Sequence, residues 1–233
     1  ELDGHRRAFN RAFAEAQLPW HWDPVLYLEL LRISGGRERL RHYLEQVEGA
    51  APAAERVEAL QRAKQRHYGA LVAAGALRLR PGVLRLMQDA AAAGLRQAIV
   101  TTSGRMAVQA LLGQLLPQAP VLLPLWVCGE DVARKKPDPE AYARALALLD
   151  LPAAAVLAVE DSGNGVAAAR GAGLAVLVCR SASSAHEPEE AFAGAQAVLN
   201  HLGEPHEPCT VLAGPACSDG WVTLSYLQQL LAR

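Results

Sequence analysis

The chain has 233 residues, of which 51% are apolar, and a formal net charge of −1. A chain of this size can bury a sizeable core, and its near-zero charge gives no electrostatic reason to expect nucleic acid or an anionic membrane as a partner. No apolar run approaches the length of a membrane span. Cys128, Cys179, Cys209 and Cys217 are scattered without metal-type spacing, so we expect reduced thiols in a cytoplasmic protein.

Residues 1–76 show helical periodicity and predict a helical unit. Phe9 and Phe13 share one helix face, and a longer helix is indicated by apolar or long side chains at intervals of three and four residues. The positions of that longer helix face are Val57, Leu60, Lys64, Tyr68 and Leu71.

The segment Ser34–Leu40 is the first candidate for binding an anion. Its small residues, Gly35 and Gly36, predict a turn that opens a helix containing Arg37 and Arg39. Backbone N–H groups and guanidinium groups there could hold a phosphate. The alternative, a solvated helix face on which Glu38 forms weak surface pairs with its basic neighbours, stays open.

The pattern changes near residue 77, where strand-like apolar runs begin to alternate with alanine-rich helices. This alternation predicts βα units and a parallel sheet over residues 77–233. The last helix is expected at 222–231. The strands are predicted at about 98–102, 121–127, 155–160 and 174–179.

Two polar segments in this half could bind phosphate. Thr101, Thr102 and Ser103 follow a strand and precede a probable helix, where hydroxyl and backbone N–H groups can hold an anion. Further along, the segment Arg134–Pro139 places cations, including Lys136, just before a helix that is opened by proline.

The strand expected at 155–160 ends in two adjacent carboxylates, Glu160 and Asp161. Open α/β sheets bind ligands at the carboxyl ends of their strands, and carboxylate oxygens suit Mg²⁺. The alternative is that both acids only favour a helix start. We expect Ser162 and Asn164 to orient the acidic pair.

The order of these features resembles the haloacid dehalogenase-like hydrolases, in their phosphoglucomutase-like branch. That family has a Rossmann-like parallel sheet core with an inserted helical cap, so the resemblance implies a cap over 1–76 and an α/β core over 77–233. It also implies that Thr101 and Lys136 hold the transferring phosphoryl group, supported by Thr102 and Ser103. Glu160 and Asp161 would hold Mg²⁺.

The family's nucleophile motif, Asp-x-Asp-Gly-Thr, does not occur in this sequence. In the family its first Asp attacks phosphorus and its second protonates the leaving group. Leu2–His5 resembles the motif only superficially, because Glu1 stands in the place of the nucleophile. Since Asp3–Asn10 resembles the first cap helix, we expect roughly fifteen to twenty further residues ahead of Glu1, about a strand plus a turn.

Several segments along nearly the whole chain resemble the CbbY-type xylulose-1,5-bisphosphate phosphatases. The resemblance implies removal of the 1-phosphate from xylulose 1,5-bisphosphate, an inhibitor of the Calvin cycle enzyme Rubisco, through an aspartyl-phosphate to give xylulose 5-phosphate. The segments are His5–Asn10, Trp20–Asp23, Gly35–Tyr43, Arg80–Gly82 and Gly194–Leu199.

On this interpretation the cap cations hold the phosphate that stays on the sugar. The candidates are His5, Arg37, Arg39 and Lys64, with Arg80 at the hinge. His5 could equally be a core histidine beside Phe9, and Lys64 could simply extend along Tyr68 with its ammonium group in water.

Two other functions remain open at this point. The same fold and cap could serve a phosphosugar mutase of the β-phosphoglucomutase type, which returns the phosphoryl group to a bound intermediate. A protein without a nucleophile could also bind a phosphorylated metabolite without turnover.

Overall fold

The computed structural model describes residues 1–233, which form two compact units. The N-terminal helical unit comprises Glu1–Arg78 and Thr102–Pro117. The α/β unit comprises Leu79–Thr101 and Gln118–Arg233. The sequence-based division at residues 76 and 77 lies close to the first of these boundaries, but it assigns 102–117 to the core, whereas in the structure this segment clusters with the helical unit.

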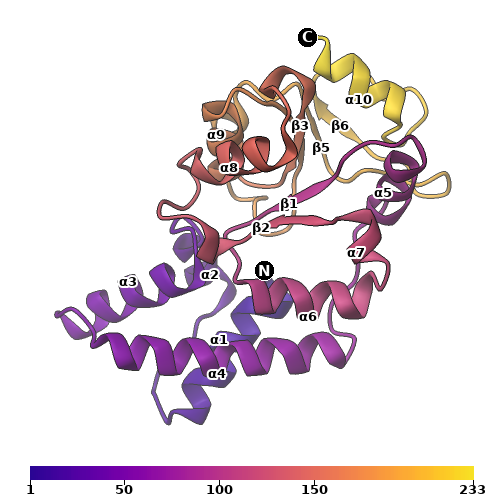
Figure 1. The fold of residues 1–233 in the computed structure, drawn as a ribbon. Helices are drawn as coiled ribbons and strands as arrows, with labels where there is room; N and C mark the ends of the chain where they lie inside the picture. Colours follow the sequence, from indigo (N-terminus) through magenta and orange to yellow (C-terminus); the bar gives the residue numbers. More distant parts are fainter. The chain divides into compact units, whose positions relative to one another are not determined.

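The helical unit is held together by the long helix α4, which packs against α1 and α6 (Figure 1). Its α2 begins where Asp23 caps the backbone N–H of Leu26 at 2.9 Å and a proline takes the first helical position. The helices are a π-helical turn η1 (Leu2–Arg6), α1 (Arg7–Glu15), α2 (Pro24–Leu30), α3 (Gly36–Glu48), α4 (Ala54–Ala73) and α6 (Arg105–Leu115).

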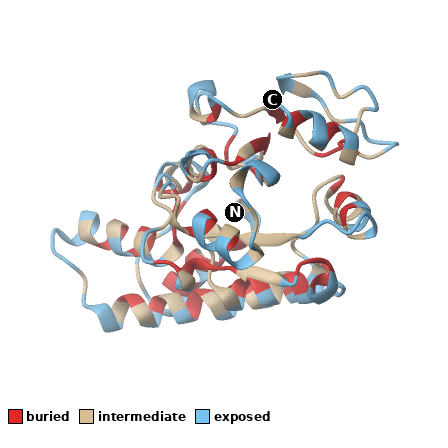
Figure 2. Cartoon of the chain, turned by 45° about the horizontal axis from the view of Figure 1, so that its top comes forward, coloured by how far each residue is buried: buried red, intermediate tan, exposed pale blue.

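An aromatic cluster forms the core of this unit. Phe9, Phe13 and Trp22 are fully buried, and the ring centroids of Phe9 and Trp22 lie 4.6 Å apart. Buried and exposed residues alternate along the helices (Figure 2), and the face predicted for the longer helix, from Val57 to Leu71, is buried in α4. The helical periodicity of this segment is therefore confirmed.

The α/β unit alternates strands with helices, as Figure 1 shows. Its helices and short helical turns are α5 (Val83–Ala92), α7 (Ala119–Leu122), η2 (Gly129–Asp131), α8 (Glu140–Leu149), η3 (Ala153–Ala155), α9 (Gly163–Gly171), η4 (Glu189–Phe192) and α10 (Leu224–Leu231). Its strands are β1 (Ala98–Val100), β2 (Leu125–Val127), β3 (Leu157–Glu160), β4 (Ala175–Cys179), β5 (Ala197–Leu199) and β6 (Val211–Ala213).

The strands pair as two sheets. β1 and β2 run parallel with Val100 opposite Val127, and β3, β4 and β5 run parallel with Glu160 opposite Val178. The sixth strand, β6, is antiparallel to β5. The predicted α/β class with a parallel sheet is confirmed, and the parallel pairing places the carboxyl ends of neighbouring strands at the same sheet edge.

One predicted strand begins later than its apolar run. The run at 121–127 starts with the helix α7, which has a proline in its first turn, and only residues 125–127 pair as β2. Proline in a first turn favours a helix start, so hydrophobicity alone misplaced the strand boundary. No helix of the structure combines the length and the apolar character needed to cross a membrane.

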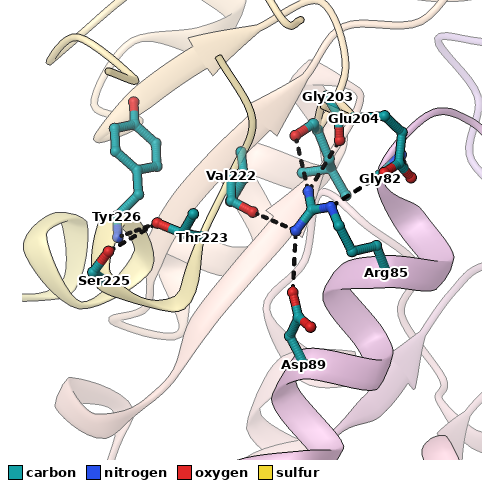
Figure 3. Close-up of polar contacts among 10 residues, drawn as sticks. Gly82, Arg85, Asp89, Gly203, Glu204, Val222, Thr223, Ser225 and Tyr226 are labelled. Atoms are coloured by element: carbon teal, nitrogen blue, oxygen red, sulfur yellow. Dashed lines mark hydrogen bonds and ion pairs between the residues drawn. The ribbon is translucent and has the colours of Figure 1, made fainter. Parts of the chain in front are cut away.

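Arg85 on α5 ties this helix to the C-terminal loops (Figure 3). Its Nη1 donates to the carbonyl of Val222 at 3.0 Å and its Nη2 to the carbonyl of Gly203 at 3.0 Å. It also forms ion pairs with Glu204 at 3.3 Å and Asp89 at 3.2 Å. Only 19% of the Arg85 side chain is exposed, so its contacts with the two carbonyls and with Glu204 are largely shielded from water, whereas Asp89 is 49% exposed.

Replacing Arg85 should destabilise the protein. Arg85→Met keeps the aliphatic stem but leaves two carbonyls and Glu204 without their donor, so we expect a loss of about 1–3 kcal/mol in the free energy of unfolding. The urea midpoint measures it. The matched control is Arg134→Met, whose side chain is 70% exposed and should change stability by no more than about 0.5 kcal/mol. Equal urea midpoints for the two variants would contradict this role.

Candidate active site

Lys136 lies at the centre of a buried polar cluster in the α/β unit. Only 8% of the residue is exposed. Its Nζ donates to the carbonyl of Val100 at 2.8 Å and to Oε1 of Glu160 at 2.5 Å. The lysine therefore joins the end of β1 to the end of β3, and it places a cation between two strand ends.

Tyr142, on α8, is the third member of this cluster. Its hydroxyl donates to the same Oε1 of Glu160, and its ring centroid lies 4.7 Å from Nζ of Lys136. Burial, reinforced by the negative charge of Glu160, raises the pKa of Tyr142 well above its ordinary value. The hydroxyl thus remains a donor over the physiological range. Sequence reasoning missed this residue, although its position in the first turns of the helix after Lys136-Pro137 could have indicated it.

Glu160 and Asp161 stand at the carboxyl end of β3. Glu160 is buried, whereas Asp161 is half-buried and its Oδ2 accepts a hydrogen bond from Oγ of Ser181 at 3.1 Å. The N-cap of the following helix α9 is Ser162, which accepts from the backbone N–H of Gly165 at 3.2 Å. Since Ser162 supplies the cap, the two acids are not needed for that purpose.

Gly165 is a second feature that sequence reasoning missed. A Cβ atom at this position would overlap the carboxylate of Glu160. The first turn of α9 therefore accommodates the carboxylate only because residue 165 has no side chain. The glycines on both sides of Asn164, which is itself half-buried in that turn, were the available signal.

The two carboxylates face a cavity of about 230 Å³ in the α/β unit. Its remaining lining residues are Arg80, Pro81, Val83, Val159, Cys179 and Leu202. No group of three or more His, Cys, Asp or Glu side chains in the structure could hold a metal ion. Two carboxylates nevertheless fit Mg²⁺, because this ion keeps several water ligands and is often held by one or two carboxylates together with substrate phosphate.

The hydroxyl residues that were predicted to bind phosphate directly follow β1, whose last carbonyl accepts a hydrogen bond from Lys136. The backbone N–H of Thr101 donates to the carbonyl of Val127 at 2.9 Å and so extends the pairing of β1 and β2. Thr101 directly follows Val100, whose carbonyl binds Lys136, so the structure brings these two predicted phosphate ligands together. Thr102 and Ser103 come next in the chain and are half-buried ahead of α6.

The guanidinium group of Arg80 donates hydrogen bonds to backbone carbonyls. Its Nη1 donates to the carbonyl of Cys179 at 2.9 Å, and its Nη2 donates to the carbonyls of Arg180 at 2.6 Å and Asn200 at 2.5 Å. The side chain therefore links the carboxyl ends of β4 and β5 at the wall of the cavity.

Arg39 in the helical unit is also held by backbone groups. It is 6% exposed, with Nε donating to the carbonyl of Leu30 at 3.1 Å and Nη2 to the carbonyl of Ile33 at 3.1 Å. Its Nη1 donates to the hydroxyl of Tyr27 at 3.3 Å. Arg37, by contrast, is 57% exposed and pairs with Glu58 of α4 at 3.0 Å, so it lies on a solvated helix face, but its partner is not the Glu38 that the alternative named.

His5 and Lys64 lie together against Tyr68. The rings of His5 and Tyr68 stack with centroids 4.2 Å apart, and Nζ of Lys64 lies 5.4 Å from the centroid of Tyr68 and 5.2 Å from that of Phe9. Lys64 is only 3% exposed, so its ammonium group does not reach water. Nδ1 of His5 is buried and has no hydrogen-bond partner.

Burial sets the charge of this pair. It lowers the pKa of Lys64 to about 8, with the charge of Glu1 opposing the shift. Burial and the positive charge of Lys64 lower the pKa of His5 to about 3. At neutral pH the helical unit thus holds a neutral imidazole and a buried ammonium group, with the carboxylate of Glu1 acting electrostatically on both.

A family model described as haloacid dehalogenase-like hydrolase matches residues 2–173. The chain belongs to this family, and the predicted enzyme class, a phosphoric monoester hydrolase, is confirmed. Within the family the chain is 42% identical over 235 residues to the plasmid protein CbbY of Cupriavidus necator, an alignment that covers 96% of this chain and 89% of that protein.

Two solved structures show the same likeness. CbbY from Rhodobacter sphaeroides in complex with phosphate is 39% identical, with a TM-score of 0.78 over 84% of this chain and 86% of that one. A mutant of that protein in complex with xylulose 1,5-bisphosphate is also 39% identical, with a TM-score of 0.79 over 86% of this chain and 88% of that one. The predicted resemblance to CbbY is confirmed.

The lowered pKa of Lys64 predicts a pH-dependent stability. Between about pH 8 and pH 10 the unfolded chain keeps the lysine proton while the folded chain has lost it, so the free energy of unfolding should rise with pH. Lys64→Met should remove a rise on the order of 1–2 kcal/mol between pH 7.5 and 9.5. Urea unfolding at both pH values measures the difference, and identical pH slopes for the two proteins would contradict the assigned shift.

Proposed function

We propose that the protein is a Mg²⁺-dependent sugar bisphosphate phosphatase that converts xylulose 1,5-bisphosphate to xylulose 5-phosphate. The observation that carries this proposal is the likeness to a CbbY whose solved structure contains xylulose 1,5-bisphosphate, at 39% identity over 86% of this chain. The buried cluster around Lys136 supports it, because it holds a cation between the end of β1 and Glu160 at the end of β3, where Asp161 is the next residue.

Lys136 and Thr101 are the residues we assign to the transferring phosphoryl group. Lys136 brings a fixed positive charge, and its position is defined by the carbonyl of Val100, by Glu160 and by Tyr142. A preorganised cation stabilises the charge on the phosphoryl oxygens without reorganising during the reaction. Thr101 adds a hydroxyl at the adjacent strand end, and Thr102 and Ser103 continue the polar segment.

Glu160 and Asp161 would hold the magnesium ion, with Ser162 and Asn164 beside them in the turn. When bound, Mg²⁺ neutralises phosphate oxygens and fixes their orientation. Glu160 shares its Oε1 with Lys136 and Tyr142, so the metal and phosphate ligands of this chain are coupled through one carboxylate.

Family resemblance assigns the attack on phosphorus to an aspartate of the Asp-x-Asp-Gly-Thr motif, with an aspartyl-phosphate as the intermediate. That motif is not among residues 1–233, and its position ahead of Glu1 stays a prediction. Assays of the reaction should therefore use the full natural chain.

The phosphate that remains on the sugar is assigned to the neutral His5 and to the cations Arg37, Arg39, Lys64 and Arg80. The support differs among them. Lys64 and His5 form a buried pair with an unpartnered ring nitrogen, which a polar ligand could satisfy. Arg39 and Arg80 already donate to backbone carbonyls, so they would contribute mainly their charge.

A phosphate-release assay tests the reaction. The full chain with Mg²⁺ should release one phosphate from xylulose 1,5-bisphosphate, with xylulose 5-phosphate as the product in ³¹P NMR, and chelation of Mg²⁺ should stop release. A transfer to another sugar hydroxyl without release would identify a mutase instead. Absence of both reactions would contradict the proposal.

Lys136→Met should lower kcat by about 10²- to 10³-fold, because the transferring group loses its fixed cation. This variant leaves a buried carboxylate unpaired and could unfold the protein, so Lys136→Arg, which keeps the charge but moves it, is measured beside it. Circular dichroism reports folding for each. The control is Lys135→Met, which removes the neighbouring cation and should have a nearly normal kcat. A folded Lys136→Arg variant with normal kcat would refute the role assigned to Lys136.

A further inference from the structure

The loop of residues 180–187, which follows β4, contacts the turn that carries Asp161. We infer that this loop positions the Asp161 carboxylate for metal binding, with Ser181 as the positioning residue. The inference rests on the proposed metal-dependent function, and it concerns residues that lie outside the family-matched segment 2–173.

Ser181 makes the direct contact. Its Oγ donates to Oδ2 of Asp161 at 3.1 Å, and Oγ of Ser183 lies 2.8 Å away, where it can donate to Ser181 in turn. The backbone N–H of Ser181 donates to Oγ of Ser184 at 2.9 Å. A serine hydroxyl has a single hydrogen, so when Ser183 donates to Ser181 the hydrogen of Ser181 is available for the carboxylate.

Arg180 fixes the course of the loop. One nitrogen, Nη2, donates to the carbonyls of Ser184 at 3.2 Å, Ala185 at 3.1 Å and Glu187 at 2.9 Å. The guanidinium carbon lies 4.9 Å from the ring centroid of Phe192, which is buried. The hydrogen bonds of this one side chain restrain the backbone of the loop, and they thereby restrain the position of Ser181.

Glu187, at the C-terminal end of the loop, makes a second contact with the turn that carries Asp161. Oε2 of Glu187 accepts a hydrogen bond from the backbone N–H of Gly163 at 2.8 Å, and a Cβ atom at Gly163 would lie only 2.6 Å from that oxygen. Gly163 is two residues after Asp161 and begins α9. Contacts at both ends of the loop therefore restrain the turn in which Asp161 lies.

A hydrogen bond to one carboxylate oxygen restrains the orientation of the carboxylate and hence the direction of the other oxygen. Such supporting contacts to metal ligands contribute about 10- to 100-fold to metal affinity. Ser181 has the geometry of such a contact, since it lies on the neighbouring strand's loop and reaches Asp161 across the sheet edge.

Magnesium binding by the full chain tests the inference without relying on turnover. The dissociation constant for Mg²⁺ is obtained from the dependence of the melting temperature on Mg²⁺ concentration. Ser181→Ala should raise it about tenfold, and Ser181→Thr, which keeps the hydroxyl, should restore most of the affinity. The matched control is Ser225→Ala on α10, whose Oγ lies 2.8 Å from Oγ1 of Thr223, and this variant should leave the constant unchanged.

A second variant, Arg180→Lys, tests the same role independently in case Ser181→Ala fails to fold. Arg180→Lys keeps Ser181 but removes the guanidinium hydrogen bonds that close the loop, and it should also weaken Mg²⁺ binding. At saturating Mg²⁺ both variants should recover most of the wild-type kcat, which a catalytic role would not allow.

The outcomes separate the two proposals. If the wild-type protein shows no stabilisation by Mg²⁺, the metal-dependent function itself fails. If the wild-type protein binds Mg²⁺ and the folded Ser181→Ala and Arg180→Lys variants bind it equally well, the positioning role is overturned while the proposed function stands.

Discussion

The buried ion pair between Lys136 and Glu160 is the interaction on which the arrangement of the candidate site in the α/β unit depends. Its side chains are 9% and 8% exposed, so both charges have lost most of their water. Such a pair is tolerated only where further hydrogen bonds compensate, and removing one partner costs about 3–5 kcal/mol. The carbonyl of Val100 and the hydroxyl of Tyr142 provide that compensation. The same atoms that keep the charges buried thus define where a phosphoryl group would meet its cation.

Three arginines of the α/β unit bind main-chain carbonyls. Arg80 joins the ends of β4 and β5, Arg85 joins α5 to the C-terminal loops, and Arg180 closes the loop beside Asp161. A planar guanidinium with several donors suits this purpose better than an ammonium group. These three arginines therefore stabilise the fold of the unit, while Lys136 is the buried cation of the candidate site.

The sequence predicted what depends on local pattern. The strand ends carrying Thr101 and Glu160, the placement of Lys136 before a helix, and the buried face of α4 all follow from hydrophobic runs and spacing. What it could not predict are contacts made across the fold. Tyr142 and Ser181 reach the acidic pair from 18 and 20 residues away, and their roles appear only once the strands are side by side. The strands β5 and β6 were missed for a different reason, because each has only three residues and so carries little periodicity.

Gly165 shows that a site can be shaped by what a residue lacks. The position has no functional group, yet any side chain there would occupy the space of the Glu160 carboxylate. Even alanine, usually the mildest replacement in a helix, would push this acid from Lys136 and from the place assigned to the metal. A comparison of relatives that weighs only charged and nucleophilic residues would overlook it. For anyone redesigning this enzyme, position 165 belongs with the acids and the lysine among those that must be left untouched.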